Sequence, residues 1–393
     1  MGVTTIDERP TTGTESGIPV GQQQVSDGES TVGNPLGAGS VGAVGRELVP
    51  GVLAIDAGNS KTDVALVGAA GQVLGTARGG GFVPHIVGSE VAVAGLAPLV
   101  TAAAAEAGLD IGAGHGPLAT HVSACLANAD LPVEEKLLQE LIAGYGWSRT
   151  TVVANDTFAL LRSGTDAPRG VAVVCGAGIN CVGLLPDGRT ARFPALGMIT
   201  GDWGGGGGLA NEVMWAAARA EDGRGPHTAL AAAAAAHFGL ESALAVAEAV
   251  HLGDIEEARL HELVPVLFAT AEAGDATALE LVDRQADEVV RLAVVALRRL
   301  ELLDSPADVV LGGGVLASRQ PLLLDGINAR LAADAPLAVP RIVTTPPVVG
   351  AALLGLDHLA AAGLGGAPGA QERLRASYAL RRPAASDGAA RMV

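Results

Sequence analysis

Basic side chains are scarce in this chain of 393 residues. Lysine and arginine together number 25, against 42 aspartates and glutamates, which gives a formal net charge of −17. Nucleic acids and anionic membrane surfaces attract basic proteins, so this balance argues against both as partners. The sequence contains two lysines, Lys61 and Lys136. A lysine inside a candidate binding loop is therefore informative.

Cysteines and long apolar runs are also scarce. The three cysteines are an odd number without paired CxxC spacing, which argues against disulfides and structural zinc. Cys175 and Cys181 fall on predicted core strands, where a free cysteine is usually a small buried hydrophobe. No apolar run reaches the roughly 18 uncharged residues of a membrane span, and the first residues lack the basic start and apolar core of a signal peptide. We therefore expect a cytoplasmic protein.

The length of the chain allows two domains with substantial cores. Residues 1–50 are rich in Gly, Ser, Thr and Gln without helical or strand periodicity, so we expect a disordered leader. Residues 366–393 turn to Gly, Pro, Ala and Arg. For these we expect a flexible, solvated tail in preference to a specific binding arm.

A glycine-rich stretch at 171–208 organises the second half of the chain. It predicts a strand, a Gly-Ala-Gly turn, a second strand, a Pro-Asp-Gly turn and a third strand, after which five consecutive glycines open a helix. Gly176 and Gly178 allow a tight turn whose N–H groups approach an anion, because no Cβ stands in the way. Most such turns are only hairpins, so this turn alone is a weak signal for phosphate binding.

The same plan occurs near the start of the folded region. Residues 53–62 are a short apolar strand that ends in a small-residue turn, and 63–67 and 72–77 are two further strands. Both halves therefore begin with a three-strand meander whose first turn is polar and carries glycine. Two such turns facing each other across a cleft can hold a polyphosphate between them.

Helices and strands alternate after each meander. In the first half we expect helices at 91–107, at 133–143 and after 156, with strands at 120–125 and 151–154. In the second half a helical insertion at 209–303 precedes strands at 308–311 and 341–343 and a final helix at 348–356. The order βββαβαβα is that of a layered α/β domain, so each half has the same skeleton.

The first of these turns has side chains suited to phosphoryl transfer, which needs bound phosphates, a metal ion that spreads charge and a base for the attacking hydroxyl. Asp56 ends the first strand and is well placed to hold Mg²⁺ through water. Four neighbours could donate hydrogen bonds to the β- and γ-phosphates: Asn59, Ser60, Lys61 and Thr62. For Lys61 the alternative is an ordinary exposed lysine on a hairpin.

Three further positions have two interpretations each. Asp156 follows an apolar strand, where α/β sheets place ligands, so it is either a base for a substrate hydroxyl or an N-cap for the next helix. Asp202 either binds substrate hydroxyls or caps a turn. The glycines 312–314 either admit adenosine close to the backbone or form a tight start to the next helix.

Together these motifs resemble the sugar kinase/heat-shock/actin ATPase superfamily. Within it they resemble the BadF-type ATPases, most closely their N-acetylglucosamine and glucosamine kinase members. The resemblance covers about residues 53–356, where five motifs occur in the family's order. These are a first phosphate motif at 56–62, a connecting motif at Asn155-Asp156, a second phosphate motif at 175–181, an adenosine motif at 309–316 and a second connecting helix at 348–356.

The resemblance implies an α/β fold of two ribonuclease-H-like, or actin-like ATPase, domains with a cleft between them. Residues 51–165, completed by a helix at 348–363, would form the first domain. Residues 166–347 would form the second, with its helical insertion at 209–303. ATP and Mg²⁺ are the implied cofactors.

The resemblance also implies roles for individual residues. Asp156 would be the catalytic base and Asp56 the metal-binding residue. Asn155, Asp156, Asn180 and Asp202 would contact the sugar. The implied nucleotide-binding residues are Asp56, Gly58, Asn59, Ser60, Lys61, Thr62, Gly176, Ala177, Gly178, Gly312, Gly313 and Gly314.

The sequence departs from the family at three points. Its second phosphate loop reads Gly176-Ala177-Gly178-Ile179 where relatives have Gly-Thr-Gly-Ser, so two hydroxyls are lost and backbone N–H groups must contact the γ-phosphate there. The segment 79–85 lies where relatives have a sugar loop with an asparagine, and it has none. The cysteine-rich zinc motif of the ROK-type sugar kinases is absent.

The leading hypothesis is an ATP-dependent kinase that transfers the γ-phosphate to the 6-hydroxyl of N-acetylglucosamine or glucosamine. Its expected partner is this small-molecule amino sugar, and a homodimer is left open. The alternative is a BadF-type ATPase that activates a partner redox enzyme through an iron–sulfur cluster shared by two subunits. Such a cluster needs thiolates near a dimer interface, which cysteines inside the nucleotide motif do not suit. A third hypothesis, a regulator without catalysis, is disfavoured because both Asp56 and Asp156 are present.

Overall fold

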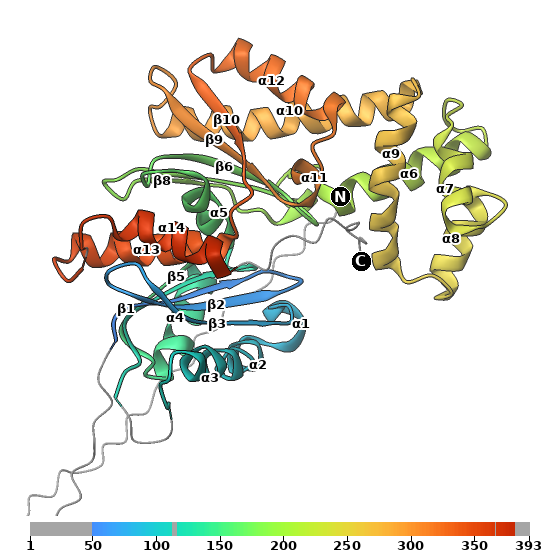
Figure 1. Ribbon diagram of the computed structural model, residues 1–393. Helices are drawn as coiled ribbons and strands as arrows, with labels where there is room; N and C mark the ends of the chain where they lie inside the picture. The colour runs from blue at the N-terminus through green and yellow to red at the C-terminus, as the bar shows by residue number, and fades with distance from the viewer. Residues whose placement is uncertain (1–48, 112–115, 366, 382–393) are drawn as a thin grey trace, which may run out of the picture. The chain divides into compact units, whose positions relative to one another are not determined.

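The computed structural model describes residues 49–111, 116–365 and 367–381 (Figure 1). The predicted leader, residues 1–50, lies outside the described residues except for its last two, which begin the first strand. The last twelve residues of the predicted tail also lie outside them.

The described strands form two five-stranded sheets with the same topology. In each sheet the first strand pairs antiparallel with the second and parallel with the fourth, giving the order β3-β2-β1-β4-β5 in one and β10-β9-β6-β7-β8 in the other. The first sheet contains β1 Val49–Ala57, β2 Thr62–Gly68, β3 Val73–Gly79, β4 Ala119–Leu126 and β5 Ser148–Asn155. The second contains β6 Gly170–Cys175, β7 Ile179–Leu184, β8 Thr190–Arg192, β9 Ala307–Gly312 and β10 Ala338–Ile342. The predicted α/β fold class is confirmed.

Helices connect the strands of each sheet. Those of the first half are α1 Pro84–Val87, α2 Ser89–Ala94, α3 Ala97–Glu106, α4 Pro132–Gly144 and α5 Asp156–Gly164. Between β8 and β9 come η1 Gly197–Ile199, α6 Gly205–Glu221, α7 Leu230–Phe238, α8 Ala243–Leu252, η2 Glu257–Glu262, α9 Leu263–Glu272 and α10 Ala276–Arg299. The remaining helices are α11 Gly314–Ala317, α12 Pro321–Asp334, α13 Pro347–Ala361 and α14 Ala370–Arg381.

Each sheet is covered on both faces, because successive side chains of a strand point to opposite sides. In β1, Leu53 and Ile55 join a buried cluster with α3 and α4, whereas Val52 and Ala54 join another with α13. In β6, Val173 packs toward α10 and α12, and Ala172 packs toward α5. Burial on both faces explains why these strands read as continuous apolar runs.

Two helices each pack against the sheet of the other half of the chain. Helix α5 follows the first sheet but packs on β6 and β7, and α13 follows the second sheet but packs on β1 and β4. The two helices contact each other closely, since a Cβ at Gly350 would overlap the carbonyl oxygen of Ala159. The two sheets are therefore joined through this helix pair. The sequence-based division between residues 165 and 166 falls just before β6.

The prediction of a flexible tail at 366–393 is wrong for residues 370–381, which form α14. Leu374 is fully buried in the cluster beneath α13. Arg375 donates hydrogen bonds to the carbonyl oxygens of Ser163 and Thr165 at the end of α5. The buried leucine and the guanidinium on carbonyls at the end of α5 help to hold this helix in place, together with the hydrogen bond from Arg162 to Gln371. Figure 1 shows α13 and α14 alongside the strands of the first sheet.

One stretch of the described residues, Ser89–Glu106, is long and apolar enough to cross a membrane by composition alone, and α7 with α8 reaches that length only as a bent pair. The stretch is interrupted between α2 and α3, and Val93 and Val100 belong to the core cluster against the first sheet. Core helices commonly pass such a test, so it is weak evidence for a membrane span.

Candidate active site

The carboxyl ends of the parallel strands bring the polar residues of the first sheet together. Asp56 of β1 lies opposite Cys125 of β4, and the next row joins Ala57 to Leu126 and Leu126 to Asn155 of β5. Asp56 and Asn155 are thus one row apart at the same edge of the sheet. Open α/β sheets place their ligands at this edge.

Asp156 is the first residue of α5 and is not its cap. The capping residue is Asn155, whose side-chain oxygen accepts a hydrogen bond from the N–H of Thr157. Of the two interpretations of Asp156, the N-cap is therefore wrong. Burial raises the pKa of Asp156 to about 6, although hydrogen bonds from Thr157 act against the rise. A carboxylate with this pKa is mostly ionised at pH 7 and can accept a proton.

Asp56 is a buried carboxyl in an acidic neighbourhood. Burial, followed by the charges of Asp156 and Asp63, raises its pKa well above the ordinary value, and Lys61 opposes the rise. Asp63 lies directly opposite Asp56 in the β1–β2 register and is paired with Arg78 at 2.6 Å. A cation beside Asp56 would relieve this repulsion, so the donor chemistry fits Mg²⁺. Among the described residues no three metal-ligating side chains cluster. Mg²⁺ in proteins usually keeps several water ligands.

The loop after β1 is held by backbone and amide contacts and leaves its tip exposed. The N–H of Gly58 donates to the carbonyl of Lys61 at 2.9 Å, which closes the turn. Asn128, which follows β4, donates to the side chain of Asn59 at 2.8 Å. The backbone of Gly81 packs against the carbonyl of Asn59 so closely that a Cβ there would overlap it. Ser60 and Lys61 are exposed at the tip, while Thr62 is buried at the start of β2.

Three glycine segments meet at the loop after β6. The N–H groups of Gly206 and Gly207, at the start of α6, donate to the carbonyls of Gly176 and Ala177 at 2.7 and 2.8 Å. Gly313 has a φ of +84°, and a Cβ there would overlap the backbone of Cys175. Gly205 and Gly313 are therefore required by backbone packing, since a Cβ at Gly205 would likewise overlap the backbone of Gly178. The tight helix start expected as an alternative for Gly312, Gly313 and Gly314 is present, with α11 beginning at Gly314.

A buried glutamine, Gln285 of α10, supports this junction. Its side-chain oxygen accepts from the N–H of Gly205 at 2.9 Å, and its amide nitrogen lies 3.6 Å from the sulfur of Cys175. Because the side chain is fully buried, both ends of the amide need these partners. The position of the second glycine turn is thus fixed from inside the second half of the molecule.

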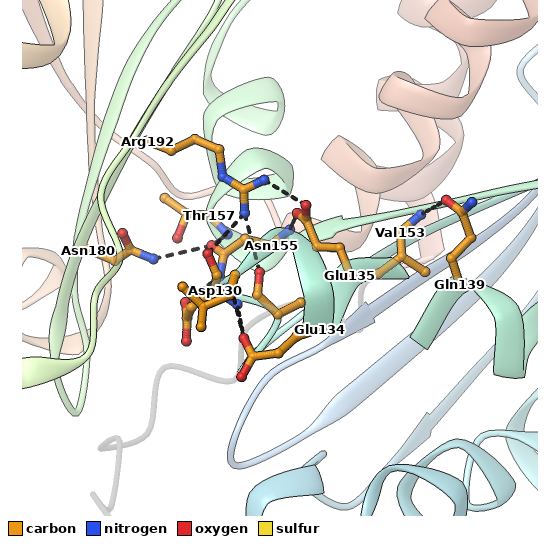
Figure 2. Close-up of polar contacts among 11 residues, drawn as sticks. Asp130, Glu134, Glu135, Gln139, Val153, Asn155, Thr157, Asn180 and Arg192 are labelled. Atoms are coloured by element: carbon orange, nitrogen blue, oxygen red, sulfur yellow. Dashed lines mark hydrogen bonds and ion pairs between the residues drawn. The ribbon is translucent and has the colours of Figure 1, made fainter. Parts of the chain in front are cut away.

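Asn155 also connects the two halves (Figure 2). Its amide nitrogen donates to Asp130 at 2.8 Å, and its oxygen accepts from the amide of Asn180 on β7 at 3.3 Å. The Asn155 side chain is buried and engaged within the protein, whereas Asn180 is only partly buried. Among the residues expected to contact the sugar, this contact brings Asn155, Asn180 and the neighbouring Asp156 together.

Asp202 lies in a different setting, in the segment between β8 and α6. Its carboxylate accepts a hydrogen bond from the hydroxyl of Thr200, within its own turn. Burial, with a smaller contribution from Asp202, raises the pKa of Glu288 on α10. The turn-capping interpretation of Asp202 thus has a contact in its favour. A role in binding sugar stays a prediction.

Sequence reasoning missed Asp130, Glu135 and Arg192. Asp130 lies four residues beyond the end of β4, and Asp156 lies directly beyond the end of β5, so a strand-end rule that includes the following turn could have identified Asp130. Burial, followed by the charge of Asp156, raises the pKa of Asp130 to about 6. Glu135 accepts from the N–H of Asn155 at 3.1 Å and pairs with Arg192 at 2.6 Å. No sequence signal marks Arg192, because its partners come from the other half of the chain.

The three cysteines are buried and unpaired, as expected for small core residues. Burial raises the pKa of the Cys175 and Cys181 thiols, so they resist conversion to the thiolates that metal clusters need. Both belong to the core cluster of the second sheet.

Comparison with known proteins identifies the family. The model of the BadF/BadG/BcrA/BcrD ATPase family matches residues 53–355. The chain belongs to this family. Family membership implies the use of ATP, and the resemblance inferred from the motifs is confirmed.

Two relatives of this family member carry kinase names. An N-acetylmuramic acid/N-acetylglucosamine kinase of Clostridium acetobutylicum is 32% identical over 104 residues, which cover 26% of this chain and 34% of that kinase. The match therefore spans about a third of its length. An N-acetyl-D-glucosamine kinase of Dictyostelium discoideum is 25% identical over 313 residues, covering 78% of this chain and 97% of that kinase.

Solved structures of similar proteins show the same fold. A protein of Chromobacterium violaceum, provisionally named an N-acetylglucosamine kinase, has 21% identity and a TM-score of 0.59, covering 77% of this chain and 98% of its own. A second of this provisional name, from Porphyromonas gingivalis, has 20% identity and a TM-score of 0.55, covering 78% and 98%. Two actin-like ATPase domains, as predicted, agree with this fold.

Proposed function

We propose that this chain is an ATP-dependent kinase that transfers the γ-phosphate to the 6-hydroxyl of an amino sugar, N-acetylglucosamine or glucosamine. Membership of an ATPase family and the names of the two kinase relatives support the class of reaction. The proposal places the enzyme in the cytoplasm, where ATP is available.

The observation that carries the proposal is the position of Asp156, whose carboxylate does not cap α5. Helix α5 already has its cap in Asn155, so the Asp156 carboxylate is not used for that purpose. It stands at the ligand-binding edge of the sheet, close enough to Asp56 to raise the pKa of that group. A second carboxylate beside a metal-binding one is the arrangement that phosphoryl transfer to a hydroxyl requires.

In the proposed reaction, the 6-hydroxyl oxygen of the sugar attacks the γ-phosphorus and the bond to the β-phosphate oxygen breaks. Asp156 accepts the hydroxyl proton, and the products are the sugar phosphate and ADP. Lys61 and the amide groups of both glycine turns would hold the phosphates, and Asn180 with Asp202 would hold the sugar. Mg²⁺ would be held by Asp56 and would supply charge neutralisation at the phosphates.

The experiment is an ADP-release assay with ATP, Mg²⁺ and a sugar panel. The panel contains N-acetylglucosamine, glucosamine, glucose, N-acetylmannosamine and N-acetylmuramic acid. ADP release that depends on an amino sugar supports the proposal, and identification of the product as the 6-phosphate supports the site of transfer. ADP release that does not depend on any sugar would contradict the proposal. It would favour a family member that hydrolyses ATP to activate a partner.

A further inference from the structure

Arg192 connects the two halves of the molecule beside the candidate base. It is the last residue of β8 in the second sheet, but its guanidinium reaches Glu135 of α4 at 2.6 Å. The same guanidinium donates to the carbonyl oxygens of Ala129 and Asp130, at 3.4 and 3.3 Å, in the turn after β4. Figure 2 shows these contacts converging below Arg192. All three acceptors belong to the first half of the chain.

Glu135 links Arg192 to the backbone of the residue that precedes the candidate base. One of its carboxylate oxygens accepts from Arg192, and the other accepts from the N–H of Asn155 at 3.1 Å. Asn155 caps α5 and immediately precedes Asp156. The carboxylate of Glu135 thus bridges the Arg192 guanidinium and the backbone of Asn155, and the guanidinium also lies over the ring of Phe158 on α5 at 5.5 Å.

The other end of Arg192 is fixed as well. Its carbonyl oxygen accepts from Arg299 of α10 at 2.8 Å, and the Arg299 guanidinium lies over the ring of Phe193 at 4.5 Å. Ten residues after Arg192 the chain reaches Asp202, the residue proposed to bind the sugar. Arg192 therefore lies at the start of the segment that carries Asp202, and the hydrogen bond from Arg299 attaches that start to α10.

We propose that Arg192, acting through Glu135, is a positioning residue that fixes the distance between the sugar-binding segment and the base Asp156. The inference rests on the proposed kinase function and deepens it, because it states how a sugar held by one half of the protein meets a base carried by the other. Phosphoryl transfer depends on such alignment, since a misplacement of about 1 Å can cost on the order of a hundredfold in rate.

The setting of the Arg192–Glu135 pair suits this role. Its side chains are 26% and 16% exposed, so water and salt screen the pair less than an open surface pair. A planar guanidinium with three acceptors also fixes direction, which a lysine at this position could not do. Arg189, three residues earlier on the same hairpin, makes contrasting exposed pairs with Asp187 and Glu301, which both belong to the second half.

The test compares Arg192→Gln, Glu135→Gln and the double variant with wild-type protein and with Arg189→Gln as matched control. We expect Arg192→Gln to lower kcat/KM for the sugar about ten- to a hundredfold, while KM for ATP changes less than about twofold. ADP release without sugar should stay at the wild-type level, so more ADP is released per sugar phosphate formed. Arg189→Gln should match the wild type.

The double variant separates positioning from a general loss of structure. If the pair acts as a unit, Arg192→Gln in the Glu135→Gln background should cost no more than about twofold further. The kcat/KM of Arg192→Lys for the sugar should lie between those of the wild type and Arg192→Gln, because lysine keeps the positive charge but lacks the planar, forked guanidinium.

Two results would overturn the inference while leaving the kinase function intact. One is an Arg192→Gln variant with sugar kinetics like those of Arg189→Gln. The other is a variant that loses sugar-dependent and sugar-independent ADP release in equal proportion with a lower melting temperature, as a purely structural residue would. Wild-type protein without sugar-dependent ADP release would instead overturn the proposed function, and this inference with it.

Discussion

The two sheets have the same strand order and carry different chemistry at their edges. After β1 the loop exposes polar side chains, Ser60 and Lys61, and Asp56 is the last residue but one of the strand. After β6 the equivalent turn is Gly176-Ala177-Gly178, which offers only backbone groups. Asp56 and Asp156, two acidic groups with a raised pKa, thus lie in the first half, and the second half contributes the amide of Asn180 and the carboxylate of Asp202.

This difference shows two ways to build a candidate phosphate loop. Side chains such as Lys61 can adjust to a ligand, at the cost of their own rotamer freedom. A backbone turn cannot adjust, so it must be placed correctly by its surroundings. In the second half Gly205, Gly313 and Gln285 provide that placement through direct backbone contacts.

The largest expected effect comes from removing the base of the first half. Asp156→Asn should lower kcat about a hundred- to ten-thousandfold with nucleotide binding retained, because the proton acceptor is lost. The raised pKa means that the ionised carboxylate disfavours the folded state above pH 4, so the variant should also melt at a higher temperature at pH 7. Turnover assays, nucleotide titration and thermal melts measure the three quantities. Near-normal turnover would remove Asp156 from the mechanism; Asp304→Asn, at an exposed turn, is the control.

The next effect concerns the helix that covers only the first sheet. Leu374→Ala should lower the free energy of unfolding by about 2–5 kcal/mol, because it opens a cavity beneath α13 and α14. Leu380→Ala, on the same helix but 87% exposed, should change it by less than about 0.5 kcal/mol. Denaturant unfolding measures both. Equal small effects would mean that α14 does not pack on the first sheet in solution.

Glycine substitutions compare the backbone turn of the second half with an unconstrained site nearby. Gly313→Ala should cost about 2–4 kcal/mol in stability and weaken ATP binding, because its φ is +84° and a Cβ would meet the backbone of Cys175. Gly208→Ala, in the first turns of α6 with open space around it, should stabilise by about 0.5–1 kcal/mol. Thermal melts and ATP titration test the pair. The same sign for both variants would contradict the packing argument.

The pH dependence tests the acidic edge of the first sheet. Asp156 acts as a base only when ionised, and its pKa is about 6. The plot of kcat/KM for the sugar should therefore be level above about pH 7 and fall about tenfold per pH unit below 6. An inflection near pH 4, the value of an ordinary aspartate, would show that burial does not act on the base.

The smallest effect should come from adding a hydroxyl side chain to the glycine turn of the second half, where the loop of the first half has polar side chains. Ala177→Thr supplies a hydroxyl that the turn lacks and should tighten ATP binding about two- to tenfold. Ala177→Val has the same shape without the hydroxyl and should give no gain. Isothermal titration with ATP and Mg²⁺ compares them. A gain with valine as large as with threonine would assign the effect to shape.

Local patterns made much of the fold predictable. The two meanders, the strands after them and the helix-opening glycines all follow from short-range periodicity and turn residues, and the order βββαβαβα is present. Asp56 and Asp156 could be selected because each lies at, or directly after, the carboxyl end of an apolar strand. The choice between Asn155 and Asp156 as the cap of α5 could not be made, because either side chain can accept the N–H bond. The extended backbone of Asn155 makes that choice.

Long-range contacts account for what the sequence did not reveal. Helix α14 lies in a segment of ordinary tail composition, and the contacts that hold it include one buried leucine and carbonyls of α5 more than 200 residues away. Arg192 and Glu135 are 57 residues apart, on β8 of the second sheet and on helix α4 of the first half. Neither pairing has a local signature.

The sequence by itself determined the elements, their order and the acidic residues at the strand ends, because these depend on neighbours within a few positions. The tertiary structure alone decided which helix covers which sheet, which glycine turn packs against α6, and which side chains join the two halves at the candidate base. Those outcomes depend on free energies of burial and hydrogen bonding between distant segments, and such energies exist only once the chain is folded.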